Sequence, residues 1–442
     1  MAVKVGMVSL GCAKNLVNGE QMLHLLRTSG YEITADLAET EVLIVNTCAF
    51  IDSAKQEAID TILEFAELKK EGRLKKLLVA GCLSQRYRKE ILKELPEVDG
   101  ILGTGSYDEI VPAVAAALRG ETPQYFGDIS APMSEEEREV TTGPGWAYLK
   151  IAEGCDNRCS YCVIPSIRGK YRSRPMEGIL REAEALAKLG IKELIVVAQD
   201  ITRYGTDLYG EPRLAALVRE LAKIRGIRWI RLHYLYPDLI TDELIDLVAA
   251  EPKVVKYLDI PIQHISDGIL KKMNRRGTGA EIEALLTKLR QRIPGLVLRT
   301  SLITGLPGEG EKEFEELCAF LKRAKLERAG VFAYSPEEGT PAYSMERPDA
   351  ETASHRAELA VDIQSEIMDE FNASRLDTVQ EVLAEGFDRF ADCWYGRTYA
   401  DSPEVDGKVF FTGSGVKPGE FIKVRITDTL EGDLVGVVEE EA

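Results

Sequence analysis

The 442-residue sequence lacks a long apolar stretch, an export leader and an excess of positive charge. No uncharged apolar run approaches the roughly 18 residues that a transmembrane helix requires. The first ten residues, MAVKVGMVSL, have too short an apolar part for a signal peptide and are typical of a first strand. The net charge of −18 disfavours passive adhesion to nucleic acid and suits a basic partner, although such a charge also simply keeps a protein in solution. We therefore expect a cytoplasmic protein without a membrane segment.

Disulfides are also not expected, because the eight cysteines would lie in a reducing compartment, where metal binding or catalysis is the usual role of cysteine. Three of them, Cys155, Cys159 and Cys162, form a Cys-x3-Cys-x2-Cys window with Tyr161 before the last. The window has no fourth cysteine, whereas a structural zinc site almost always has four ligands. Three thiolates on one loop leave a metal position open, which on an iron–sulfur cluster is a place for substrate or cosubstrate. A zinc site or a disulfide remains the alternative.

Three more cysteines follow predicted strands in the first third of the chain. The pattern predicts strands over 4–10, 42–47 and 77–80, each followed by a helix, and this alternation indicates a parallel sheet. Cys12, Cys48 and Cys82 each come just after one of these strands. Because ligands of such sheets bind beyond the carboxyl ends of the strands, we expect the three thiols to converge. The alternative is three small buried apolar residues, as unpaired cysteine often is.

The middle of the chain repeats strand and helix. Six strands are predicted, over 147–152, 194–198, 229–233, 257–262, 297–303 and 330–333. Six such units fit an incomplete barrel of the TIM type, whose active sites use the loops after the strands. The Cys155–Cys162 loop follows the first of them.

The last 70 or so residues are rich in short β-type runs, over 379–383, 394–398, 408–411, 421–426 and 434–438. Five such runs predict a small β-barrel. The fold class is therefore α/β, with domains over 1–120, 146–371 and 372–442 and a linker over 121–145 that has three prolines and no hydrophobic period. Residues 372–442 hold 7 Lys and Arg against 15 Asp and Glu. An RNA-binding barrel would be basic, so this charge indicates a basic protein partner or only a solvated acidic surface.

The window Cys155–Cys162 resembles the signature of radical S-adenosylmethionine (SAM) enzymes. By that resemblance, the three thiolates hold a 4Fe–4S cluster whose fourth iron is chelated by SAM. An electron from the cluster then cleaves SAM, and the resulting 5′-deoxyadenosyl radical removes hydrogen from an unactivated carbon. The cluster ligands are Cys155, Cys159 and Cys162, and we expect no catalytic residue beyond the cluster ligands.

The whole chain further resembles the radical SAM methylthiotransferases, which have an N-terminal three-cysteine domain, a radical SAM barrel and a C-terminal OB-like barrel called TRAM. The similar windows are Ser9–Asn15, Asn46–Ala54 and Gly81–Gln85. The resemblance implies that Cys12, Cys48 and Cys82 hold a second 4Fe–4S cluster, which carries the sulfur to be transferred. One SAM would methylate that sulfur, and a second would be cleaved at the barrel cluster.

Within this family, Gly11–Val17, Asn46–Asp52 and Ile164–Gly169 are most similar to the branch that modifies the β-carbon of an aspartate in small-subunit ribosomal protein S-twelve. Ala13, where proline is usual, and Asn18-Gly19, where Asp-Ser is usual, are departures that replace no ligand. The resemblance implies that this ribosomal protein is the substrate. The acidic charge of the TRAM domain suits docking of such a basic protein, and an electron donor such as a flavodoxin or ferredoxin is expected. The alternatives are a methylthiotransferase for isopentenyladenosine-type tRNA and a non-catalytic iron–sulfur adaptor on the ribosome.

The resemblance also names residues that would contact SAM, namely Tyr161, Gln199, Ser301, Ile303 and Gly305. Gln199 ends a predicted barrel strand, and the other three later residues belong to the segment Thr300–Gly308. A strand-end polar residue and turn glycines are the plainer interpretations. Arg168, Arg172 and Arg174 form a basic stretch that either meets carboxylates of the cosubstrate or target or is a solvated face.

Overall fold

The computed structural model describes residues 2–135 and 137–439, and the chain divides into two compact units. The first unit comprises 1–141, 150–174 and 335–343, and the second comprises 142–149, 175–334 and 344–442. Residue 136 of the predicted linker and residues 1 and 440–442 at the ends of the predicted domains lie outside the described residues. The division into three domains with a linker over 121–145 stays a prediction.

The first unit contains a six-stranded parallel sheet in the order β2-β1-β3-β4-β5-β6. Its strands are β1 (Lys4–Ser9), β2 (Glu32–Ile33), β3 (Val42–Thr47), β4 (Lys76–Gly81), β5 (Gly100–Leu102) and β6 (Gln124–Tyr125). Its helices are α1 (Ala13–Thr28), α2 (Asp52–Lys70), α3 (Cys82–Arg86), α4 (Arg88–Glu94) and α5 (Ile110–Leu118). The predicted N-terminal parallel α/β sheet is thus confirmed.

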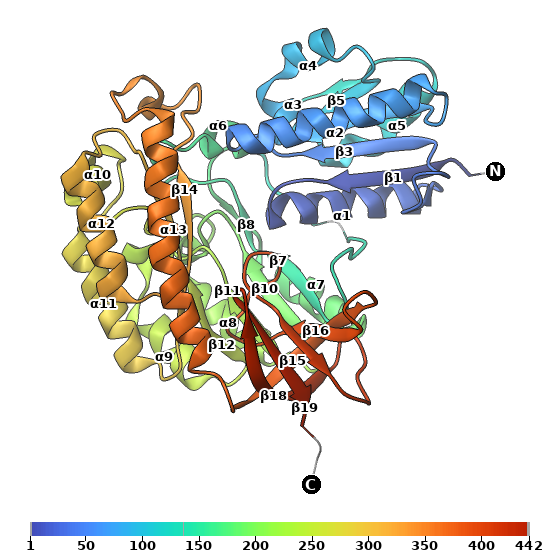
Figure 1. Ribbon diagram of the computed structural model, residues 1–442. Coiled ribbons are helices and arrows are strands. Elements are labelled where there is room, and N and C mark those ends of the chain that lie inside the picture. The colour runs from blue at the N-terminus through green and yellow to red at the C-terminus, as the bar shows by residue number, and fades with distance from the viewer. Residues whose placement is uncertain (1, 136, 440–442) are drawn as a thin grey trace. The chain divides into compact units, whose positions relative to one another are not determined.

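Both faces of this sheet are covered, which explains why β3 is apolar along nearly its whole length. Leu43 and Val45 pack in a core with residues of α2, whereas Val42 and Ile44 pack in a second core with residues of α1 and α5. Figure 1 shows α1 and α2 on opposite faces of the strands. The parallel order brings the carboxyl ends of β1, β3 and β4 to neighbouring positions on one edge.

The segment 150–174 belongs to the same unit and carries the three-cysteine loop. Two short strands, β8 (Ala152–Glu153) and β9 (Arg172–Ser173), pair in antiparallel fashion and close the base of the loop. Between them lies α6 (Ile164–Arg168), which has a proline at its first turn, where a missing N–H costs nothing.

The second unit contains a six-stranded sheet in the order β14-β13-β12-β11-β10-β7. Its strands are β7 (Trp146–Lys150), β10 (Glu193–Val197), β11 (Trp229–Leu232), β12 (Val254–Asp259), β13 (Val297–Thr304) and β14 (Arg328–Ala333). Its longer helices are α7 (Met176–Lys188), α8 (Leu214–Ala222), α9 (Asp242–Ala250), α11 (Gly279–Arg292), α12 (Glu311–Ala324) and α13 (Ala350–Ala373). The incomplete six-strand barrel is confirmed, although β12 ends before Pro261, which has no N–H to continue the ladder.

The C-terminal part of this unit is a closed five-stranded barrel in the order β15-β16-β17-β19-β18. Its strands are β15 (Val379–Asp388), β16 (Cys393–Arg397), β17 (Val409–Thr412), β18 (Phe421–Leu430) and β19 (Asp433–Val438). Val382, Val409, Phe411, Val424 and Ile426 fill its core. The five predicted β-type runs therefore form the predicted barrel, with no open edge between first and last strands.

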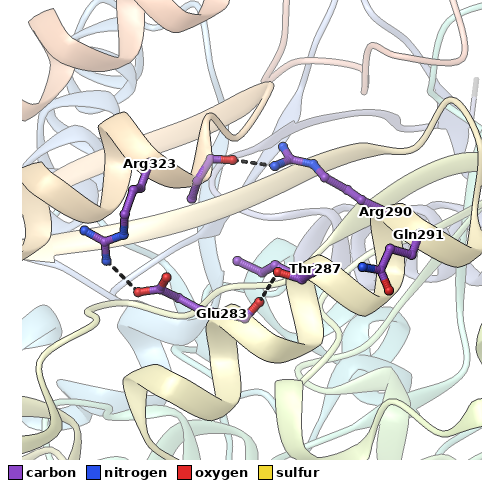
Figure 2. A pocket seen from close by; sticks show the side chains of 7 residues that line it. Glu283, Thr287, Arg290, Gln291 and Arg323 are labelled. Atoms are coloured by element: carbon purple, nitrogen blue, oxygen red, sulfur yellow. Dashed lines mark hydrogen bonds and ion pairs between the residues drawn. The ribbon is translucent and has the colours of Figure 1, made fainter.

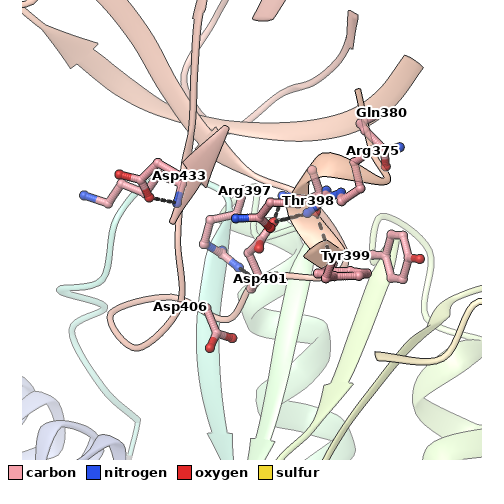
Figure 3. Close-up of polar contacts among 12 residues, drawn as sticks. Arg375, Gln380, Arg397, Thr398, Tyr399, Asp401, Asp406 and Asp433 are labelled. Atoms are coloured by element: carbon pink, nitrogen blue, oxygen red, sulfur yellow. Dashed lines mark hydrogen bonds and ion pairs between the residues drawn. The ribbon is translucent and has the colours of Figure 1, made fainter. Parts of the chain in front are cut away.

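The loop from Thr398 to Asp406, between β16 and β17, binds side chains from the larger sheet. Figure 3 shows this loop with Thr398, Tyr399, Asp401 and Asp406 drawn as sticks. Arg328 of β14 donates to Asp401 Oδ1 at 2.7 Å, and the hydroxyl of Tyr257 on β12 donates to Asp406 Oδ2 at 2.6 Å. Arg231 of β11 donates to the carbonyl of Tyr399 at 2.8 Å. The Arg328–Asp401 contact is buried and the other two are partly buried, so the C-terminal barrel is fixed to the larger sheet by polar contacts that water weakens little.

These contacts also account for part of the acidity of the C-terminal barrel. Four of its acidic side chains pair with basic residues of the larger sheet and its loops: Asp401 with Arg328, Asp406 with Arg299, Glu381 with Arg228 and Glu420 with Lys192. The charge available to an outside partner is therefore smaller than the residue count implies.

None of the helices in the described part of the chain combines the length and apolarity that crossing a membrane would require.

Candidate functional site

The N-terminal cysteines lie where the sheet order predicts. Cys12 is the N-cap of α1, Cys48 follows β3 directly, and Cys82 is the first residue of α3 after β4. Gly11 has φ = 87°, and a Cβ added there would lie 2.9 Å from Cys48 Sγ. The loops that carry Cys12 and Cys48 therefore touch, and only glycine allows that approach. Their role as metal ligands stays a prediction.

The three N-terminal thiols differ in how readily they ionise. Burial raises the pKa of Cys48 to about 12, and the nearby charges of Cys82 and Cys12 add to this rise. Burial also raises the pKa of Cys82, against the charge of Arg168. For Cys12 burial again favours the neutral thiol, but the charges of Lys14 and Arg168 outweigh it and lower the pKa. Three thiolates in this position would repel one another. A bound cation removes this repulsion, and coordination to a metal also removes the thiol protons.

The surroundings of this triad fit an iron–sulfur cluster. The buried hydroxyl of Tyr107 has no hydrogen-bond partner among the described residues, and burial together with the charges of Cys82, Glu153 and Cys12 raises its pKa against the charge of Arg168. In residues 2–135 and 137–439, no three His, Cys, Asp or Glu side chains are arranged to hold a single metal ion. Thiolates that bind a 4Fe–4S cluster attach to separate irons, so they need not converge on one point.

The loop with Cys155, Cys159 and Cys162 is held by its own backbone. The amide of Cys162 donates to the carbonyl of Cys159 at 3.0 Å, and the amide of Cys155 donates to the carbonyl of Gly169 at 3.2 Å. Cys159 is buried, whereas Cys155, Cys162 and the intervening Tyr161 are half-buried. The segments 1–141 and 150–174 both belong to the first unit, so all six cysteines of the two triads lie in one compact unit.

The other predicted SAM contacts lie in the second unit. Gln199 follows β10, and Ser301 and Ile303 are half-buried on one face of β13, while the intervening Leu302 is buried on the other. Gly305 follows β13 with φ = 74°, and a Cβ there would lie 2.3 Å from Ala353 Cβ. The amide of Gly305 donates to Glu309 Oε1 at 2.9 Å. Contact of these residues with SAM stays a prediction.

Several buried polar residues at the cysteine loops were not found from the sequence. Glu337, in the segment 335–343, accepts from Lys55 at 3.0 Å and also binds Arg86. Arg86 closes the helix that begins at Cys82, and it also donates to the carbonyl of Ala49 at 3.0 Å. Glu337 thus links the loops after Cys48 and Cys82. A Pro-Glu-Glu-Gly turn gives no signal of such a role.

Two of the three arginines in the basic stretch after the cysteine loop are not solvated, whereas Arg172 is half-buried. Arg168 and Arg174 are buried. Arg174 binds Glu135 with two nitrogens, at 3.0 and 2.7 Å, and Arg168 Nη2 lies 3.2 Å from Cys82 Sγ.

A cavity of about 370 Å³ lies between α11 and α12 (Figure 2). Glu283, Arg290 and Arg323 line it, and Arg323 binds Glu283 at 2.6 Å. None of the predicted site residues lines this cavity, so it has no place in the predicted chemistry.

Three protein-family models match the chain. They are the uncharacterized protein family UPF0004 over residues 4–103, the radical SAM superfamily over 149–321 and the TRAM domain over 378–438. A solved radical S-adenosylmethionine methyltransferase, TsrM from Kitasatospora setae with cobalamin and a [4Fe-4S] cluster bound, is similar in fold. Its TM-score is 0.58, over 78% of this chain and 77% of that chain, at 16% identity.

Two curated relatives match at full length, and both carry the name ribosomal protein uS12 methylthiotransferase RimO. The protein from Acetivibrio thermocellus is 50% identical over 100% of both chains, and that from Pelotomaculum thermopropionicum is 52% identical over 99% of both. Similarity at this level over the whole length includes all three matched regions. The chain therefore belongs to the RimO family of ribosomal protein methylthiotransferases, enzymes of the radical SAM superfamily.

Proposed function

We propose that this enzyme adds a methylthio group to the β-carbon of an aspartate in ribosomal protein uS12. The observation that carries the proposal is the full-length similarity to relatives named for this activity, at 50% and 52% identity. The two cysteine triads within one compact unit support it, because transfer of sulfur to a carbon radical requires both centres near one substrate side chain. Action on a ribosomal protein places the enzyme in the cytoplasm.

The residues that would hold the cofactors are the six cysteines. Cys155, Cys159 and Cys162 would hold one 4Fe–4S cluster, and Cys12, Cys48 and Cys82 a second. When bound, the first cluster supplies the electron that cleaves SAM and the second carries the sulfur to be transferred. We further propose Tyr161, Gln199, Ser301, Ile303 and Gly305 as contacts for SAM. Because the Gly305 amide already donates to Glu309, the contact at this residue would use its carbonyl or its Cα face.

Mass spectrometry can identify which molecule, uS12 or tRNA, is the substrate. The reconstituted protein, SAM and a reductant such as reduced flavodoxin or ferredoxin are incubated anaerobically with uS12 or with tRNA. We expect uS12 to gain the mass of a methylthio group in place of one hydrogen, and tRNA to stay unchanged. A gain on tRNA alone would assign the chain to the alternative substrate. No gain on either would leave only a non-catalytic iron–sulfur adaptor.

Replacing Gly11 with alanine is expected to disrupt the N-terminal cluster. The new Cβ would lie 2.5 Å from Cys48 Cβ, and φ = 87° is unfavourable for alanine. Iron content after anaerobic reconstitution should fall from about eight to about four per chain, since each triad holds one four-iron cluster. Gly30→Ala is the control, because Gly30 has φ = 92° with no atom within 4 Å of the added Cβ. Equal iron loss in both variants would show that backbone strain, not crowding at Cys48, is responsible.

We also propose that the turn between β15 and β16 contacts uS12. Phe390 is fully exposed there, and Asp388 and Asp392 on either side of it outnumber the adjacent Arg389, which suits a basic protein. Phe390→Ala is expected to raise KM for intact uS12 about 5- to 10-fold, the size of an aromatic anchor, and to leave KM for a short uS12 peptide unchanged. Leu189→Ala, at another exposed apolar residue, is the control. An unchanged KM for uS12 would exclude this turn from docking.

A further inference from the structure

Arg168 ends α6, six residues after Cys162, which is the last cysteine of the Cys155–Cys162 loop (the barrel triad). Its side chain nevertheless contacts residues near the N-terminus of the chain. Its Nη2 is 3.2 Å from Cys82 Sγ and donates to Asn15 Oδ1 at 3.0 Å. Its Nη1 donates to Asn18 Oδ1 at 2.8 Å and to Glu153 Oε2 at 3.2 Å. The guanidinium is therefore buried in a fixed orientation, with one of its N–H groups directed at a predicted cluster ligand.

The charges around Arg168 leave it in need of an anion. Glu153 is also bound by the buried Lys150, at 3.1 Å, so two cationic side chains share this carboxylate. Burial lowers the pKa of Lys150, against the charge of Glu153. Asn15 and Asn18, which also accept hydrogen bonds from Arg168, are neutral amides. A buried cation requires compensation, and the Cys82 sulfur is the group in contact that can become negative.

We propose that Arg168 is a positioning residue for the N-terminal iron–sulfur cluster. Its N–H···S hydrogen bond fixes the Cys82 thiolate, and its positive charge makes that cluster easier to reduce. Hydrogen bonds to the sulfurs and the local charge are among the features that set the reduction potential of such clusters. This inference rests on the proposed function, since it takes Cys12, Cys48 and Cys82 as cluster ligands.

Arg168 also ties the assembly of the N-terminal cluster to the folding of a second segment. Arg168 belongs to the segment 150–174, which also carries the barrel cysteines. The ligand environment of the N-terminal cluster is therefore complete only when this segment has folded onto the N-terminal sheet.

The test isolates the N-terminal cluster and measures its potential. The full chain with Cys155, Cys159 and Cys162 replaced by alanine is reconstituted anaerobically, and its remaining cluster is titrated with reductant and followed by electron paramagnetic resonance. Adding Arg168→Gln to this protein is expected to shift the midpoint reduction potential of the cluster to a more negative value. It is also expected to speed the loss of iron to a chelator. Adding Arg168→Lys, which keeps the charge without the planar fork, should give a smaller shift in the same direction.

Arg174→Gln is the matched control, because Arg174 is equally buried in the same stretch but binds Glu135 rather than a cysteine. It should leave the midpoint unchanged. A cluster-bearing Arg168→Gln variant with an unchanged midpoint would overturn the inference, and so would an equal shift in Arg174→Gln. If the Arg168→Gln variant binds no cluster, the Arg168→Lys variant is measured in its place, and an unchanged midpoint potential in that variant would overturn the inference. Failure of the proposed function is distinct, since it shows as the absence of a methylthio mass gain with the unmodified enzyme.

Discussion

Replacing Cys155 with alanine is expected to abolish methylthio transfer to uS12, with product falling to the level of a reaction without enzyme. The barrel triad has three cysteines within eight residues, and loss of one leaves too few thiolates on the loop to hold the cluster. Without the cluster no electron reaches SAM. Mass spectrometry of uS12 after anaerobic incubation measures the product, and iron content should fall to about four per chain because the N-terminal cluster remains.

Cys318→Ala provides the control for this result. Cys318 lies in α12, is half-buried and belongs to neither triad, so its replacement should leave both iron content and product unchanged. Persistent methylthio transfer by Cys155→Ala would contradict the enzymatic role of the loop.

Replacing Asp401 with asparagine is expected to cost roughly 3–5 kcal/mol in the free energy of unfolding of the second unit, the usual cost of removing one partner of a buried ion pair. Asp401 accepts from Arg328 at 2.7 Å and from the Thr398 hydroxyl at 2.5 Å, and Arg375 lies 3.7 Å away (Figure 3). Asparagine keeps the size but leaves two buried guanidinium groups without the charge that balances them.

Tryptophan fluorescence measures this unfolding selectively, because Trp146, Trp229 and Trp394 all belong to the second unit. The wild type and the Asp401→Asn variant should unfold at clearly different urea concentrations. Asp428→Asn, at an exposed aspartate of the same barrel, should unfold like the wild type. Equal stability of Asp401→Asn and Asp428→Asn would exclude Asp401 as an anchor of the C-terminal barrel.

Acid should weaken the same contact. Burial opposes ionisation of Asp401, but the charges of Arg375 and Arg328 outweigh it and lower the pKa to about 2, from 3.8. The unfolded chain then takes up this proton at higher pH than the folded one. The carboxylate therefore contributes about 2 kcal/mol above pH 4, and this contribution is lost as the pH falls from about 4 to about 2. The Asp401→Asn variant should lack this part of the pH dependence.

The elements of the fold were largely predictable, because each has a local signal. The predicted range of β3, 42–47, agrees with the observed Val42–Thr47, since its run of four apolar residues, Val42–Val45, has few other solutions. The five C-terminal runs all became strands of the closed barrel. The short strands β2, β5, β6, β8 and β9 were not predicted, because they have two or three residues each and owe their hydrogen bonds to neighbours distant in sequence.

Side-chain partners were not predictable to the same degree. Arg168 was assigned either to carboxylates of the cosubstrate or target or to solvent, and the structure places it on Cys82. The acidic count of the C-terminal barrel indicated either a basic protein partner or only a solvated surface, and it gave no sign that Asp401 and Asp406 pair with arginines of the larger sheet. Both differences concern pairs of charges more than 70 residues apart, which composition and periodicity cannot identify.

The sequence by itself determined the family, because the cysteine windows that carry the resemblance are local properties that the chain encodes residue by residue. Only the tertiary structure decided which charges face those cysteines and which charges anchor the C-terminal barrel. The physical reason is that a buried ion pair depends on the packing of elements distant in sequence, and its strength depends on the exclusion of water that this packing produces.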